Sequence, residues 1–303
     1  MRERNIGLVL AGTVLLVACG REAPEAQPAS PPAEAQAPAV ASAPAAAPVA
    51  EDVVTPTVYP APVSGGIDEI NVGTFSLVDG LAYPAADGSG TLVYAVSKSI
   101  ASPVLSRSAC PRVFAESLAH LRDAGFAEVT LDAEGNSPYF AFGHSYGGTG
   151  KSLSPNEWSS SLEAADGKVK GGAKHKYHGQ FEFELPLGAA QPPPAESEDS
   201  AATLAVYDRI RAAVKARDLK GVLAAQGFDA ESIAAIRGLP DIDKDLETFA
   251  TRFLEPGDPA SKYPSSFYVG GKKADGKSYW NYYGFQKCGD ALVLTSVNED
   301  QRD

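Results

Sequence analysis

The sequence predicts an α+β protein with two small folded domains, and three observations lead to this prediction. Residues Gln180–Leu185 alternate strictly between polar and apolar side chains, the period of a half-buried strand. Phe114, Leu118 and Leu121 recur at the spacing of one helix face. A polar, proline-rich break at 191–200 separates two stretches that each have the length of a small domain.

The first domain, 66–190, is predicted to be β-rich with one helix packed on a sheet. Pro111 suits the first position of that helix, and Gly125 suits its end. The pair Asp87-Gly88 is typical of a hairpin turn and is expected to join the strands at Asn71–Val78 and Thr91–Ser97. The expected strands are Asn71–Val78, Thr91–Ser97, Glu128–Leu131, Tyr139–Phe142 and Gln180–Leu185.

The second domain, 201–303, orders its elements differently, with helices first and a three-strand meander last. The helices are expected at Leu204–Ala216, at Asp229–Gly238 and around Leu246–Phe253, and the strands at Phe267–Gly270, Lys277–Gln286 and Leu292–Val297. This order resembles the cone-shaped fold of nuclear-transport-factor-like proteins. The resemblance implies that one face of the sheet meets the helices while the other lines a pocket.

The strand at 277–286 carries aromatic side chains on both faces. We expect one face to line a ligand pocket, and the alternative is a strand buried on both sides. The residues expected in the pocket are Tyr279, Asn281, Tyr283 and Phe285.

The N-terminus reads as a targeting segment. Arg2 and Arg4 precede an apolar run that is too short to span a bilayer. The run ends in Leu16-Val17-Ala18-Cys19, which resembles the lipobox of bacterial lipoproteins. The resemblance implies that 1–18 is a signal peptide and that Cys19 carries the acyl chains that hold the protein in a lipid bilayer. Gly20 after this cysteine favours the periplasmic face of the outer membrane over the inner membrane.

Residues 19–65 are expected to form a disordered tether. Between Arg21 and Ala50, 13 residues are Ala and 7 are Pro, and no large apolar side chain is present to bury. At about 3.1 Å per residue, such a tether reaches on the order of 100 Å from the membrane.

Charge and cysteine content restrict the partners and the compartment. The formal net charge is −12 and no Lys/Arg cluster occurs, so we expect no nucleic-acid binding. Besides Cys19, only Cys110 and Cys288 remain, and an even number in an oxidising compartment predicts one disulfide. That bond would join the two domains, with a cleft between them.

One segment resembles a catalytic motif. Gly143-His144-Ser145-Tyr146-Gly147 matches the G-x-S-x-G nucleophile elbow of α/β-hydrolases, which implies Ser145 as a nucleophile. Gly150 and Pro155 oppose the helix that should follow, and the later histidines, His175 and His178, come too soon for this fold. A glycine-rich loop is the preferred interpretation.

The remaining histidines do not predict a metal site. His175 and His178 would point to opposite faces of a strand, and lysines flank them. His120 falls on the polar stripe of the predicted helix with Arg112 and Glu116, where we expect a solvated residue paired with Glu116. No metal or other cofactor is expected.

The combined prediction is a non-catalytic binding lipoprotein of the cell envelope whose partner is an envelope protein or a small ligand. An inhibitor or immunity protein is the sharper form of this hypothesis. Ser89-Gly90 followed by Tyr94 is similar, with one extra residue, to the S-G-x-x-Y loop of periplasmic lysozyme inhibitors. A serine hydrolase using Ser145 and a small-ligand carrier using the aromatic strand are the alternatives.

Overall fold

The computed structural model describes residues 57–69, 72–136, 139–145, 151–152, 157–191, 195–253, 258–272 and 276–302. The predicted signal peptide, Cys19 and most of the tether lie outside these residues. Residues 52–303 form one compact unit. Its helices and antiparallel sheets confirm the α+β class. None of the described helices is long and apolar enough to cross a membrane.

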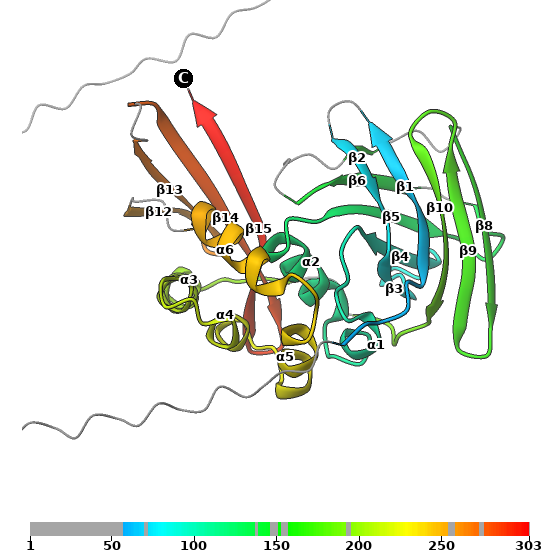
Figure 1. The fold of residues 1–303 in the computed structure, drawn as a ribbon, viewed down its shortest axis with the longest axis horizontal. Helices are drawn as coiled ribbons and strands as arrows, with labels where there is room; N and C mark the ends of the chain where they lie inside the picture. Colours follow the sequence, from blue (N-terminus) through cyan, green and yellow to red (C-terminus); the bar gives the residue numbers. More distant parts are fainter. Residues whose placement is uncertain are drawn as a thin grey trace, which may run out of the picture. The chain divides into compact units, whose positions relative to one another are not determined.

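Two antiparallel sheets face each other in the first part of the chain (Figure 1). The outer sheet has the order β2-β1-β10-β9-β8, with bounds Gly73–Ser76, Val63–Glu69, Gly179–Pro186, Lys168–His175 and Trp158–Ala165. The middle sheet has the order β3-β4-β5-β6-β7, with bounds Asp79–Pro84, Thr91–Val96, Gly125–Leu131, Tyr139–His144 and Lys151–Ser152.

The predicted single sheet is therefore a two-sheet sandwich. Phe181, Phe183 and Leu185 point into its core, as their alternation predicts, and meet Val129 and Phe140 from the middle sheet. Burying such side chains contributes about 1.5–3 kcal/mol each. The loop containing Asp87-Gly88 does join two paired strands, but they are β3 and β4.

The other face of the middle sheet packs on two helices, α1 (Ser102–Leu105) and α2 (Pro111–Leu121). Pro111 begins α2, as predicted, because a proline at the first helical turn costs no hydrogen bond. Phe114, Leu118 and Leu121 are buried by this packing.

The last part of the chain contains four helices and a third sheet. The helices are α3 (Ser200–Lys215), α4 (Leu219–Ala225), α5 (Ala230–Arg237) and α6 (Ile242–Phe253). Asp199, Asp218 and Asp229 cap the first three through their side chains. The C-terminal sheet contains β11 (Ala195–Glu196), β12 (Asp258–Tyr263), β13 (Ser266–Lys272), β14 (Ser278–Cys288) and β15 (Ala291–Arg302).

Helix α2 also packs against β15, so it lies between the middle sheet and the C-terminal sheet. One hydrophobic cluster accordingly combines side chains from both parts of the chain, on either side of residues 191–200. Buried polar contacts accompany it: Ser117 Oγ donates to Gln226 Oε1 over 2.7 Å. These contacts join residues on the two sides of the break at 191–200, and the division into two domains at that break stays a prediction.

Candidate functional site

Arg112, on the first turn of α2, lies at the centre of a largely buried polar network. Its Nε donates to Glu116 Oε1 over 2.9 Å, and its Nη1 forms an ion pair with Glu128 of β5. Nη1 also lies 3.5 Å from the hydroxyl of Tyr83, and the guanidinium stands 4.7 Å from the ring centre of Tyr94. Two carboxylates and two tyrosines therefore surround one cation.

The protonation properties of this network follow from its burial. Burial raises the pKa of Tyr83 to about 12, although Arg112 opposes the shift. Burial likewise raises the pKa of Glu128, despite the attraction of the Arg112 guanidinium. Burial by itself lowers the pKa of Arg112, but the two carboxylates outweigh it and hold that pKa above its usual value. The guanidinium thus remains charged, and the network carries more negative than positive groups.

A cavity of about 450 Å³ opens beside this network. That volume lies in the usual range for small-molecule sites. The walls combine apolar side chains, the disulfide residue Cys110 and a few polar groups: Tyr83, Ala85, Ala86, Asp87, Ser89, Leu92, Cys110, Arg112, Val113, Glu116, Thr130, Gln191, Gln286 and Lys287. Residues of both the first and the last part of the chain form it, at the place where a cleft is expected. We call it the Arg112 cavity.

A second cavity of about 220 Å³, also lined by Arg112, contains the predicted nucleophile. Ser145 follows β6 directly, is 4% exposed, and lines this cavity together with His120. Among the described residues its Oγ has no hydrogen-bond partner. The elbow motif therefore places a buried serine beside a histidine. Gly147 of that motif lies outside the described residues.

The histidine beside Ser145 comes from α2, upstream in the sequence. Burial lowers the pKa of His120 to about 4, so this imidazole is neutral at pH 7. His144 Nδ1 lies 3.2 Å from Asp123 Oδ1. These residues correct the expectation of a solvated helix stripe, because Glu116 pairs with Arg112 and His120 is half-buried.

His175 and His178 lie elsewhere, at the β9–β10 turn. Their rings stack with centroids 4.5 Å apart, and His175 Nδ1 accepts from the backbone N–H groups of Tyr177 and His178. The structure does not bring this pair to Ser145. In the described ranges, no group of three potential ligands is placed to hold a metal ion.

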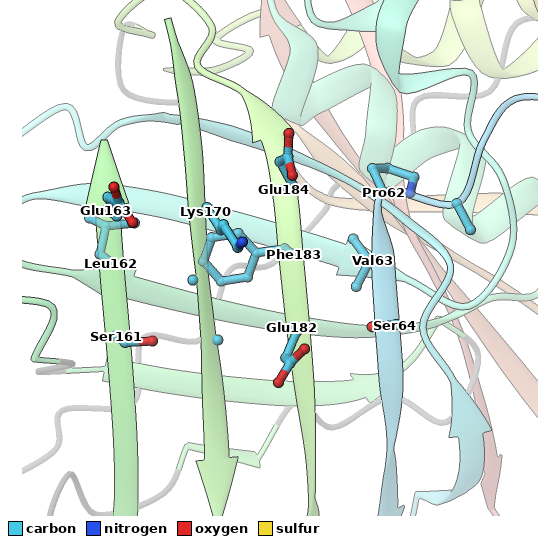
Figure 2. A pocket seen from close by; sticks show the side chains of 13 residues that line it. Pro62, Val63, Ser64, Ser161, Leu162, Glu163, Lys170, Glu182, Phe183 and Glu184 are labelled. Carbon is cyan, nitrogen blue, oxygen red and sulfur yellow. The ribbon is translucent and has the colours of Figure 1, made fainter. Parts of the chain in front are cut away.

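The outer sheet carries a shallow hollow of about 640 Å³ on its open face (Figure 2). Cross-strand pairing puts Glu163, Lys170 and Glu184 in one row, and Ser161, Gly172 and Glu182 in the next. Gly172 has no side chain, which leaves the depression. Lysines of β9 alternate with carboxylates of the neighbouring strands, so positive and negative side chains on this face largely balance each other. The hollow is a weaker candidate than the Arg112 cavity.

The predicted pocket residues of β14 lie on the side of the C-terminal sheet that faces the helices. Tyr283 is 1% exposed and packs between Tyr207 and Phe253, while Phe285 and Asn281 are also buried. The side chain of Tyr279 is not described. In this conformation, the three described side chains are part of a packed core.

The two remaining cysteines form a disulfide. Cys110 precedes α2 and Cys288 ends β14, with Cα atoms 5.8 Å apart. The bond borders the Arg112 cavity and ties the start of α2 to the C-terminal sheet.

Sequence reasoning overlooked Arg112, Glu128 and Tyr83 as site residues. The available signal was Glu128, a charged residue inside the otherwise uncharged run Phe126–Leu131. A carboxylate in such a strand needs a buried partner, and Arg112 supplies it.

The chain matches no protein-family model and no curated protein. One solved structure, of the RsbU and RsbW domains of a Mycobacterium tuberculosis protein, aligns at 12% identity with a TM-score of 0.16. The alignment covers 82% of this chain and 97% of that one. A score this low does not establish a common fold.

Proposed function

We propose that this protein is a non-catalytic binding lipoprotein, anchored through Cys19 at the periplasmic face of the outer membrane, whose ligand enters the Arg112 cavity. The lipobox supports the anchor, and the Cys110–Cys288 disulfide is compatible with an oxidising compartment. The observation that carries the binding role is the Arg112 cavity itself, with its apolar walls and few polar groups.

The chemistry of the cavity selects a class of ligand. Arg112 is already bound by Glu116 and Glu128, so a free anion would have to displace a carboxylate. The lining carries two carboxylates, Asp87 and Glu116, against two cations, Arg112 and Lys287, so the cavity favours a compact ligand with an apolar body and neutral polar groups such as hydroxyls or amides. An exposed side chain of an envelope protein that joins an apolar stem to a polar end offers the same groups, which keeps the inhibitor form of the hypothesis.

The experiment compares two variants, each of which has a tryptophan introduced into one of the two candidate sites. Leu92→Trp places an indole in the Arg112 cavity, and Ser161→Trp places the same side chain in the hollow of the outer sheet. The tagged mature protein and both variants are crosslinked in cells, captured, and analysed by mass spectrometry for proteins and extracted small molecules. We expect Leu92→Trp to lose the ligand and Ser161→Trp to keep it. Retention by both variants would contradict the proposal.

A serine hydrolase is the second candidate, favoured by one observation: Ser145 and His120 line the same small cavity. The neutral imidazole of His120 is in the protonation state of a general base. Labelling by a fluorophosphonate probe that Ser145→Ala abolishes would establish this activity. Absence of labelling in the folded protein leaves the binding role.

A further inference from the structure

The face of the C-terminal sheet opposite the helices carries a cluster of aromatic side chains. Tyr268 of β13 pairs with Tyr282 of β14, and Trp280 lies two residues along the same strand. Tyr283 and Phe267 alternate with them and are buried on the helix side. We call Tyr268, Trp280, Tyr282, Ser296 and Asn298 the aromatic platform; the last two belong to β15, beside Gly284 and Tyr282.

Two glycines allow the rings to lie against the sheet. Gly270 pairs with Trp280, and a Cβ built on this glycine would be 2.8, 2.8 and 3.0 Å from three adjacent carbons of the indole. Nearly equal distances to adjacent ring atoms mean that the glycine lies under the ring face and not at its edge. A Cβ on Gly284 would likewise be 3.0 Å from Tyr282 Cε1. The opposite face of the indole is therefore directed away from the sheet.

The outward ring face is accessible. Trp280 is 38% exposed, one of five large hydrophobic side chains exposed among the described residues, whereas Trp158 stacks on Phe140 with centroids 3.3 Å apart. Large aromatic side chains at a surface mark interaction sites more often than scattered aliphatic ones.

The chemistry of the platform differs from that of the outer sheet. Its five side chains are all uncharged, and Asn298 Nδ2 donates to Ser296 Oγ over 3.3 Å beside the rings. Trp280 is paired with Asp300 of β15, and Ser278 is paired with Lys272 and Arg302, so the residues at this end of the platform carry both signs of charge and give no net attraction to a basic partner. Flat rings bordered by amide and hydroxyl groups fit a ligand that has an apolar face and polar edges.

We propose that the aromatic platform binds a neutral polysaccharide through stacking of its sugar rings on Trp280. One face of a pyranose ring presents C–H groups, which the negative face of an indole attracts, while ring hydroxyls reach donors and acceptors at the edge. The anchor proposed above would hold this surface near the glycan strands of the cell wall. The site is separate from the Arg112 cavity.

The test uses the mature protein and a β-1,4-linked N-acetylglucosamine hexamer. We expect the hexamer to shift the tryptophan emission, because Trp280 is accessible and the other tryptophan, Trp158, is half-buried and stacked on Phe140. Calorimetry should show binding about tenfold weaker or more in Trp280→Ala, with most of the affinity restored in Trp280→Phe. Tyr177→Ala removes a more exposed aromatic on the β9–β10 turn and should leave binding unchanged.

Three outcomes would overturn the proposal. The first is that the folded protein does not bind the hexamer. The second is that it binds choline, a cation without sugar rings, and not the hexamer. The third is that Trp280→Ala converts a dimer to a monomer in sedimentation while the wild-type protein does not bind the hexamer. Leu92→Trp separates this proposal from the preceding one, since filling the Arg112 cavity should leave hexamer binding intact.

Discussion

Arg122 Nε donates to Asp245 Oδ2 over 2.7 Å, with 4% and 7% of the two side chains exposed, and so joins the end of α2 to α6. The same guanidinium donates to the carbonyls of Ser99 and Pro240, and Lys98 Nζ lies 2.7 Å from Asp245 Oδ1. Each guanidinium nitrogen of Arg122 and each carboxylate oxygen of Asp245 thus has a partner, which is the condition under which a buried ion pair is tolerated.

Arg122→Ala should lower the free energy of unfolding by about 3–5 kcal/mol, because it leaves the buried Asp245 carboxylate facing only Lys98. Arg107 is the matched control, since it pairs with Glu231 at the surface with 64% and 67% of the side chains exposed. Arg107→Ala should change stability by less than about 1 kcal/mol. Urea denaturation measures both, and equal effects would contradict the role assigned to Arg122.

The disulfide should contribute substantially to stability, because it closes a loop with a sequence separation of 178 residues. The loop-entropy argument gives about 2–5 kcal/mol. We expect Cys110→Ser/Cys288→Ser to reduce the free energy of unfolding by that amount at neutral pH. Adding a reductant should then lower the stability of the wild-type protein and leave the double variant unchanged. A response of the variant to the reductant would show that another effect is responsible.

Ser145 and Ser117 offer a comparison between an unpaired and a paired buried hydroxyl. Ser145→Ala removes an oxygen that has no hydrogen-bond partner among the described residues, so stability should stay within about 1 kcal/mol or rise. Ser117→Ala removes the 2.7 Å donor of the buried Gln226 Oε1, which keeps the backbone N–H of Leu294 at 3.1 Å, and should cost about 0.5–1.5 kcal/mol. Thermal denaturation tests both. A large loss in Ser145→Ala would point to an unrecognised partner of its hydroxyl.

The sequence predicts individual elements better than it predicts their assembly. The strand Gln180–Leu185 and the helix from Pro111 have clear local periods, and both are present as β10 and α2. Strands β8 and β9 were missed because small and charged residues dominate them, as in Ser159–Ser161 and Lys168–Gly172. Their stability comes from cross-strand pairing, which no local pattern reveals.

The candidate site was missed for a similar reason. Arg112 and Glu116 stand on one helix face, and a polar stripe on a helix usually faces water. Here the middle sheet covers that stripe, and Glu128 and Tyr83 provide the partners. A sequence shows the polar residues but not the distant strand that buries them.

His120 predicts a specific dependence of stability on pH. Its pKa is about 4 in the folded protein because burial disfavours the charged imidazole, against about 6.5 in the unfolded chain. The unfolded state therefore binds more protons between these values, and stability contributed by the neutral imidazole is complete above pH 6.5 and is lost as pH falls toward 4. The two pKa values correspond to a loss on the order of 3 kcal/mol.

His120→Gln removes the titration while keeping a polar side chain of similar size. The difference in free energy of unfolding between wild type and variant should therefore shrink or change sign as pH falls from 7 to 4. Only the wild type loses stability in this range, because its folded state disfavours the protonated imidazole. Denaturation at a series of pH values gives the curve, and NMR titration of the His120 ring should show a midpoint near 4. A constant difference across that range, with a ring midpoint near 6.5, would mean that water reaches this histidine and that the cavity beside Ser145 is open to solvent.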